Sequence, residues 1–207
     1  MTLTLESAPQ IHVNSFPTKL APPAGSTTII GALQVQQVIE ASRTNPRKRM
    51  ILPFHKTPEA PLHRMLNALQ PYSYIRPHRH LFPPKPESII VLCGALLCVI
   101  FNPQGKVQNT LTLAVGTADF GFDCEPGIYH TFLALLDDTV LFEVKPGPYQ
   151  ADNDKDFAAW APSADSLEVP SYLASLYSLV TSTEYSQYRG APWHSHHVET
   201  TCLRAEK

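Results

Sequence analysis

The chain has 207 residues, of which 43% are hydrophobic and 16% are charged. Its 16 Lys and Arg residues nearly balance its 18 Asp and Glu residues, for a formal net charge of −2. This balance argues against nucleic acid as a partner, because proteins that bind polyanions usually carry a basic face. No window approaches the roughly 18 apolar residues of a membrane span. The first residues lack the basic-then-apolar order of a signal peptide, so we expect a cytoplasmic protein. The length of the chain suits one compact domain.

The first 71 residues are predicted to contain an irregular arm and two helices. Residues 1–28 hold four prolines and no periodic apolar pattern, which is typical of an arm. Residues 29–71 form the helical lead-in. Its first helix has an apolar face and ends before a proline, as shown by Ile30, Leu33, Val38, Ala41 and Asn45-Pro46. Its second helix is predicted over Leu62–Leu69, where apolar residues repeat at i, i+3, i+4 and i+7.

From Tyr72 onward, short runs rich in β-branched and aromatic residues alternate with turn residues. We expect strands at Ser73–Ile75, Ser88–Cys93, Ala95–Phe101, Val107–Val115, Phe120–Cys124, Thr131–Leu135 and Val140–Lys145. Turns at hairpin spacing separate them, so residues 72–150 are predicted to form a small antiparallel barrel or a double-sheet jelly roll. Ile89–Leu92 is apolar without alternation, which suggests that a helix or a second subunit covers its outer face. We therefore expect a homodimer.

Residues 151–207 are predicted to be an extension of the barrel. They begin with an acidic loop and contain one more helix, over Tyr172–Leu179. The polar tail that follows carries a histidine cluster at His194, His196 and His197. This cluster has the composition of a metal site but no strand to fix it, so solvent exposure or adventitious metal binding is the preferred interpretation.

The most informative motif is the pair His78 and His80. In a strand the side chains alternate between faces, so both imidazoles of an H-x-H pair point the same way and can share one ion. Six residues then separate His80 from Glu87, which would begin a strand. His130 follows Gly127 in a turn that would deliver a further histidine into a strand. A metal site is the leading hypothesis.

Together, H-x-H, the later glutamate, Gly94 and the P-G-x-x-H motif resemble the two motifs of the cupin superfamily. More closely, Ser73–His80, Phe101–Gly105, Phe142–Tyr149 and Phe157–Pro162 resemble the WbuC family of cupin-fold metalloproteins. The similarity runs from about residue 41 to residue 162. It implies a mainly β cupin jelly-roll barrel with short flanking helices at both ends. It also implies one divalent metal ion, held by His78, His80, Glu87 and His130.

The sequence departs from the general cupin pattern at several positions. Tyr72 stands where a glycine usually opens the first motif, and Ala134 replaces the usual terminal asparagine of the second. Glu125 occupies a position often taken by proline, and the spacing between His80 and Glu87 is longer than the common three or four residues. These departures concern the loops, while all four ligand types are present.

Three imidazoles and one carboxylate suit Zn, Fe, Ni, Co or Mn, so composition does not choose the metal. Glu143 would be a general base or a partner of a ligand imidazole if it faces the barrel, and an ordinary ion-pair residue if it faces outward. Arg76 and Lys85 could bind an anionic substrate at the mouth or be solvated surface charges. Tyr74 would either pack in the core with its hydroxyl hydrogen-bonded or contact the substrate.

The resemblance and the ligand chemistry together favour a metal-dependent enzyme, such as an isomerase or lyase. Its substrate would be a small polar molecule, for example a sugar derivative, since the WbuC family takes its name from bacterial surface-polysaccharide gene clusters. One alternative is a non-haem iron oxygenase, which uses the same ligand types. The other is a non-catalytic module that binds metal and a small ligand, and it predicts a cavity without a base near the ion.

Overall fold

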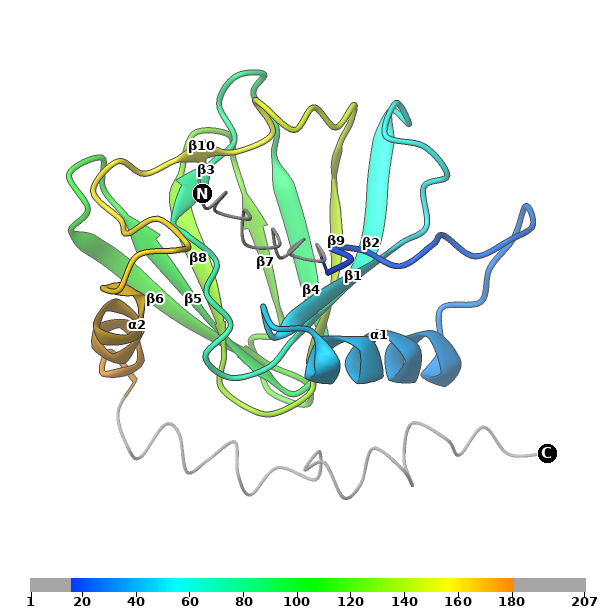
Figure 1. Cartoon of the computed structure of the whole chain (residues 1–207), viewed down its shortest axis with the longest axis horizontal. Coiled ribbons are helices and arrows are strands. Elements are labelled where there is room, and N and C mark those ends of the chain that lie inside the picture. Colours follow the sequence, from blue (N-terminus) through cyan, green and yellow to red (C-terminus); the bar gives the residue numbers. More distant parts are fainter. Residues whose placement is uncertain (1–15, 181–207) are drawn as a thin grey trace, which may run out of the picture.

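The computed structural model describes residues 16–180, which form two antiparallel β-sheets and two short helices (Figure 1). The N-terminal part of the fold contains α1 (Ala32–Thr44), β1 (Arg49–Pro53), β2 (Leu62–Leu69), β3 (His78–Arg79), β4 (Glu87–Cys93) and β5 (Ala95–Phe101). The remainder contains β6 (Val107–Ala114), β7 (Gly121–Cys124), β8 (Tyr129–Ala134), β9 (Thr139–Pro146), β10 (Asp156–Phe157) and α2 (Val169–Tyr177).

The strand order confirms the predicted jelly roll. One sheet has the order β1-β2-β9-β4-β7 and the other the order β10-β3-β8-β5-β6. From β2 to β9 the chain crosses between the sheets at every connection except the β5–β6 hairpin. This arrangement is the double-sheet jelly roll, in which each sheet takes strands from both halves of the sequence.

Apolar side chains pack in three layers. The inner layer lies between the sheets and includes Ile89, Leu96 and Phe132. On the outer face of the first sheet, α1 packs its buried residues against β1, β2 and β9. On the outer face of the second sheet, Leu173 and Leu176 of α2 pack against β5 and β8. Both predicted terminal helices are thus present, and Figure 1 shows them beside different sheets.

The second predicted helix is wrong, because Leu62–Leu69 is strand β2. Leu66 and Ala68 face α1, while Met65 and Leu69 face the space between the sheets. A strand that is covered on both faces loses its alternation of apolar and polar residues, and its apolar positions happen to match a helical spacing. The predicted strand at Ser73–Ile75 is also absent, and its place as the crossing to the second sheet is taken by β3.

The end of the predicted arm lies along the first sheet. Lys19 forms a parallel bridge with Ile51 of β1, and the Leu20 N–H donates to the Ile51 carbonyl at 2.8 Å. Residues 1–15 and the tail with His194, His196 and His197 lie outside the described residues. Between residues 16 and 180, neither helix has the length and apolar character needed to cross a membrane.

Candidate metal centre

The four predicted ligands meet between the two sheets. His78, His80, Glu87 and His130 are all buried, and one ligand atom from each lies within 4.8 Å of those of the others. His78 in β3 is the direct cross-strand partner of His130 in β8, while Glu87 comes from the opposite sheet. The span is close to that of ligands on opposite sides of an ion with bonds of about 2.1 Å. The group could therefore hold one metal ion.

The long spacing between His80 and Glu87 is accommodated by a closed loop. Leu81 and Pro84 form a bridge, and the Gly127 N–H donates to the His80 carbonyl at 3.1 Å. Lys85 then anchors the loop, because its ammonium donates to the Pro148 carbonyl at 2.7 Å and to Asp154 Oδ1 at 3.0 Å. Glu87 consequently starts β4 with its side chain facing inward, like Ile89 and Val91 after it.

Backbone carbonyls fix the three imidazoles. Nδ1 of His78 lies 2.9 Å from the Arg76 carbonyl, and Nδ1 of His130 lies 2.9 Å from the Ile128 carbonyl. Nδ1 of His80 lies 2.5 Å from the Asp154 carbonyl. A carbonyl only accepts, so each Nδ1 carries a proton and Nε2 is the ring atom left to face the other ligands. This is the arrangement in which histidines bind metal in proteins.

One donor atom of the group lacks a partner. His130 Nε2 is buried without a hydrogen bond among the described residues, and its nearest charged atom is Glu87 Oε2 at 3.5 Å. His80 Nε2 lies closer to the same oxygen, at 3.0 Å. Buried polar atoms are rarely left without partners. An ion among these atoms would satisfy His130, so the residues present fit a divalent metal.

The titration behaviour of the group reflects its burial. Burial lowers the pKa of His78 well below its ordinary value, so this imidazole is neutral. Burial alone would raise the pKa of Glu87, but His130 and His80 hold it well below its ordinary value. Burial also opposes the charge on His130, but the neighbouring Cys124 and Glu87 raise its pKa to about 10. Without metal, Glu87 is thus a carboxylate beside a protonated His130, and metal binding must displace that proton.

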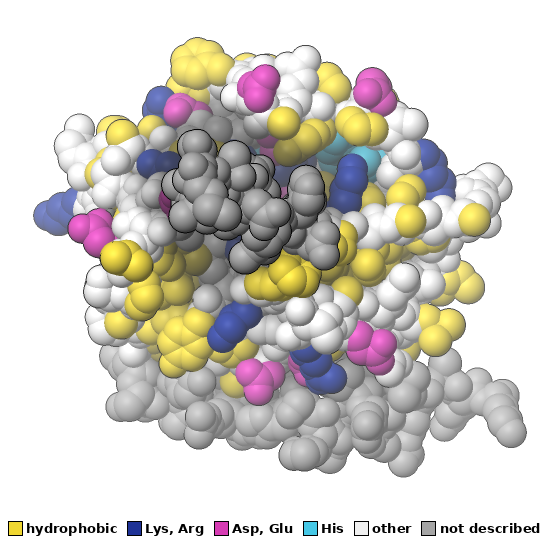
Figure 2. Space-filling model, in the orientation of Figure 1, with side chains coloured by type: hydrophobic (Ala, Val, Ile, Leu, Met, Phe, Trp, Pro, Cys, Tyr) yellow, Lys and Arg dark blue, Asp and Glu magenta, His cyan; other side chains and the backbone are white. Residues whose placement is uncertain are grey.

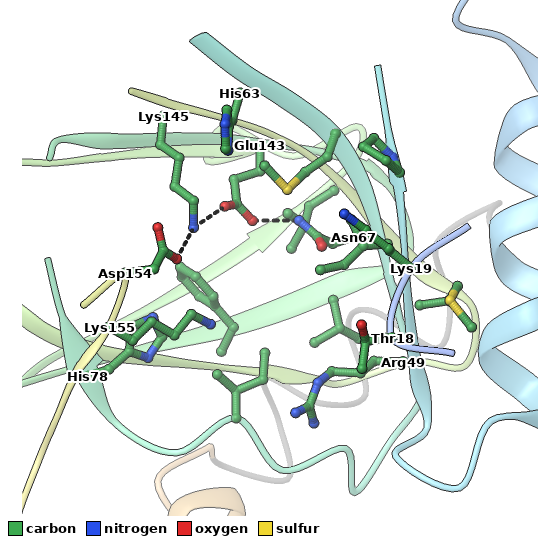
Figure 3. A pocket seen from close by; sticks show the side chains of 18 of the residues that line it. Thr18, Lys19, Arg49, His63, Asn67, His78, Glu143, Lys145, Asp154 and Lys155 are labelled. Carbon is green, nitrogen blue, oxygen red and sulfur yellow. Dashed lines mark hydrogen bonds and ion pairs between the residues drawn. The ribbon is translucent and has the colours of Figure 1, made fainter. Parts of the chain in front are cut away.

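A cavity of about 490 Å³ adjoins the metal centre and is lined by two of the ligands, His78 and Glu87. Glu143 also lines it, which settles the side of the sheet on which this residue lies (Figure 3). Glu143 is buried, accepts from Asn67 Nδ2 at 2.5 Å and pairs with Lys145 Nζ at 3.1 Å. Burial raises the pKa of Glu143 above its ordinary value, although Lys145 opposes the shift.

The three residues considered for substrate contact lie in different surroundings. Arg76 lines the cavity, and its Nη2 donates to the Ala158 carbonyl at 2.8 Å. Tyr74 borders the cavity too, but its hydroxyl donates to the Pro162 carbonyl at 2.7 Å. Lys85 is buried in the loop anchor and lies outside the cavity lining.

Sequence reasoning missed several residues of this region. Asp154 accepts from the anchor Lys85, pairs with Lys145 at 3.5 Å and offers its carbonyl to His80. Arg49 lines the cavity from β1, and Lys155 lines it from the segment before β10. The sequence near Asp154 and Lys155 shows only an acidic loop, and Arg49 ends a basic run and begins β1, a strand that was not predicted. No local pattern marks either as a cavity residue.

Comparisons with known proteins provide little beyond the fold. A family model described as a domain of unknown function (DUF6016) matches residues 30–113. No curated protein matches the sequence.

Three solved structures illustrate the likeness of fold. KdgF from Halomonas sp. is 17% identical with a TM-score of 0.40, over 53% of this chain and 87% of that one. L-ribose isomerase from Cellulomonas parahominis, solved with L-psicose, is 16% identical with a TM-score of 0.42, over 55% and 70%. An oxalate oxidase, solved with the substrate analogue glycolate, is 14% identical with a TM-score of 0.40, over 70% and 73%. Likenesses this weak carry no information on activity or substrate.

The molecule itself identifies its fold. The strand order is that of a double-sheet jelly roll, and the H-x-H pair, Glu87 and His130 lie together inside it. The narrower resemblance to the WbuC family stays a prediction. The described part of the chain is a double-sheet jelly roll with a buried three-histidine, one-glutamate group that could hold a metal ion.

Proposed function

We propose that the chain is a metal-dependent enzyme that acts on a small polar substrate, such as a sugar derivative, in the cavity beside the buried histidines. One observation carries the proposal: the cavity is lined both by two of the ligands and by Glu143, a further buried carboxylate. A volume of about 490 Å³ suits a small molecule.

The ion and the cavity residues would have separate roles. A bound divalent ion would supply a Lewis acid that polarises a substrate oxygen. Glu143 would hold or move a proton at its carboxylate oxygens. Asn67 and Lys145 engage one oxygen each and so fix the orientation of the carboxylate. Its raised pKa suits this task, because an acid–base group works best when its pKa approaches the working pH.

Glu143 also weighs against the non-catalytic alternative. A module that only binds metal and ligand has no need of a base near the ion, and burying a carboxylate has a cost in stability. Here the carboxylate lies in the same cavity as the ligands His78 and Glu87. This supports proton transfer, as in an isomerase or lyase, more than binding alone.

The experiment measures metal-dependent proton transfer. The metal-loaded protein is incubated in D₂O with small sugars, sugar acids and hydroxy acids, and deuterium incorporation and product formation are followed by NMR and mass spectrometry. Glu143→Gln should keep its metal and lose about 100-fold or more in rate. Glu125→Gln is the matched control, because Glu125 is exposed and outside the cavity lining.

Three results would contradict parts of the proposal. If Glu143→Gln exchanges deuterium at the wild-type rate, Glu143 does not carry the proton. If the protein consumes oxygen with Fe(II) but shows no reaction with Zn, the oxygenase alternative replaces the isomerase or lyase. If the metal-loaded protein binds members of the mixture tightly without exchange or turnover, it is a binding module.

A further inference from the structure

The cavity holds more basic than acidic side chains. Its lining includes six basic residues, Lys19, Arg47, Arg49, Arg76, Lys145 and Lys155, and three acidic residues, Glu87, Glu143 and Asp154. By contrast, basic and acidic side chains are interspersed over the face shown in Figure 2. The excess of positive charge is therefore a property of the cavity and is not visible in the nearly neutral composition of the chain.

The three acidic residues are already engaged. Glu87 lies against His80 and His130 in the metal centre. Glu143 pairs with Lys145, and Asp154 pairs with both Lys145 and the loop anchor Lys85 (Figure 3). None of them is left to neutralise the other basic residues of the lining.

Arg49 illustrates the resulting imbalance. Its guanidinium donates to the Tyr74 carbonyl at 2.5 Å and to Ser73 Oγ at 3.4 Å, and no carboxylate pairs with it among residues 16–180. Burial, with help from the charge of Arg47, lowers the pKa of Arg49 to about 10. A largely desolvated guanidinium without a counter-charge is unfavourable, so an anion at this position would stabilise it.

Lys155 is in the same situation. Its side chain extends into the cavity (Figure 3), and among residues 16–180 the cavity carboxylates Glu143 and Asp154 form their ion pairs with Lys145 and Lys85, not with Lys155. Burial and the charges of Lys145 and Arg49 lower its pKa to about 8, although Glu143 and Glu87 oppose the shift. Lys155 and Arg49 both line the cavity, so their two positive charges add to its attraction for an anion.

Arg76 adds a third donor. One nitrogen of its guanidinium donates to the Ala158 carbonyl, and the group lies 5.5 Å from the centre of the Phe157 ring. Its Nε is buried and has no hydrogen-bond partner among the described residues. Arginine and lysine donors around one cavity are the usual means of binding carboxylate or phosphate.

We propose that the substrate carries an oxyanion group, a carboxylate or a phosphate, which binds in the basic part of this cavity lining, formed by Arg49, Arg76 and Lys155. This inference deepens the proposed function and rests on it, because the rest of the substrate would reach the metal centre in the same cavity. It also removes Lys85 from the predicted anion site, because Lys85 is already paired with Asp154.

The test is anion binding by the full chain, measured by calorimetry with inorganic phosphate and with succinate. The metal-free protein is measured first, so that an anion cannot bind through the metal. Lys155→Met and Arg49→Met keep the length of the side chain without its charge, and each should weaken binding about 10-fold or more. Lys106→Met is the matched control, because Lys106 is exposed and outside the cavity lining. Lys155→Arg should retain binding, which distinguishes loss of charge from misfolding.

The outcomes separate this inference from the proposed function, because metal uptake is measured on the same samples. Binding of phosphate alone, or of succinate alone, supports the site and names the source of the oxyanion. If an anion binds but the protein takes up no metal, the anion site stands and the proposed function fails. If neither anion binds, or if Lys155→Met and Arg49→Met bind as tightly as wild type, the anion site is wrong whatever the metal result.

Discussion

Asp154 connects the metal centre with the buried Glu143–Lys145 pair through three contacts. Its carboxylate accepts from Lys85 and Lys145, and its carbonyl accepts from the ligand His80. Burial alone would raise its pKa, but Lys145 and Lys85 hold it below the ordinary value. Asp154 thus fixes three groups: Lys85 in the loop before Glu87, Lys145 beside Glu143, and the ring of His80.

Asp154→Asn should destabilise the protein by about 3–5 kcal/mol, because it leaves Lys85 and Lys145 buried with less counter-charge. Asp156→Asn is the matched control two residues away. Its ion pair with Arg79 is partly exposed, so its loss should cost no more than about 1 kcal/mol. Urea unfolding of the metal-free variants measures both values, and equal effects would show that Asp154 is no more important than a surface acid.

Lys155 should make stability depend on pH between about 8 and its ordinary pKa of 10.5. In this window the unfolded chain keeps the proton that the folded protein has released, so stability rises with pH. Below pH 8 both states carry the charge, and the folded state bears the full cost of burying it. The stability of Lys155→Met relative to wild type should therefore fall as pH rises from 7 to 10. A difference that does not change with pH would contradict the burial of this charge.

At the scale of elements, the helices explain where strands lose their alternation. The outer faces of β2 and β5 are covered by α1 and by the α2 region. β5 is apolar throughout, and the second half of β2 has apolar residues on both faces, with Leu66 and Ala68 on one and Met65 and Leu69 on the other. β4 has no helix over most of its outer face, and its burial alternates, with Ile89 and Val91 buried and Ile90 exposed, although Ile89–Leu92 is apolar throughout. Burial on two faces therefore produced the misleading pattern in Leu62–Leu69.

Leu66→Ala should test the assignment of this segment. Leu66 is fully buried against α1, so the variant should lose about 2–5 kcal/mol of unfolding free energy. Leu62→Ala, on the same face of the same strand, is the control, because Leu62 is 47% exposed and should cost no more than about 0.5 kcal/mol. Similar losses from both changes would mean that α1 does not cover β2 as described.

The parts of the site that could be predicted are those with a local signature. His78 and His80 follow from the period of a strand, and His130 from a turn at Gly127, which has a positive φ of 86°. Lys155 and Arg49 could not be predicted, because their role depends on which carboxylates are already paired. Which carboxylates are paired depends on how the two sheets are arranged, and neither Lys155 nor Arg49 belongs to a sequence motif.

At the scale of the whole molecule, the two sheets enclose a polar centre at one end of an apolar interior. The inner layer around Leu96 and Phe132 fills most of the space between the sheets, and the ligands lie where β4 and β8 begin. The fold buries the four ligands together with Glu143 and Lys145, which strengthens their electrostatic interactions. The other basic residues of the cavity lining are only partly buried or exposed, so they remain accessible to solutes.

The homodimer remains a prediction, and one apolar area of the surface supports it. Ile90 on the outer face of β4 is 45% exposed, and the neighbouring Phe120, whose carbonyl accepts from the Val91 N–H, is 52% exposed. If a second copy covers this area, wild type should sediment as a dimer and Ile90→Lys as a monomer. A wild-type monomer at tens of micromolar concentration would contradict the expectation.

The metal content of the protein, purified without a histidine tag or chelator, decides whether the buried histidines and Glu87 form a metal centre. Wild type should contain or take up about one equivalent of a divalent ion, and His78→Ala/His130→Ala should take up none. His63→Ala is the control, because His63 lines the same cavity but does not belong to the ligand group. Wild type without metal after reconstitution, or a double variant that binds metal as wild type does, would contradict the central claim.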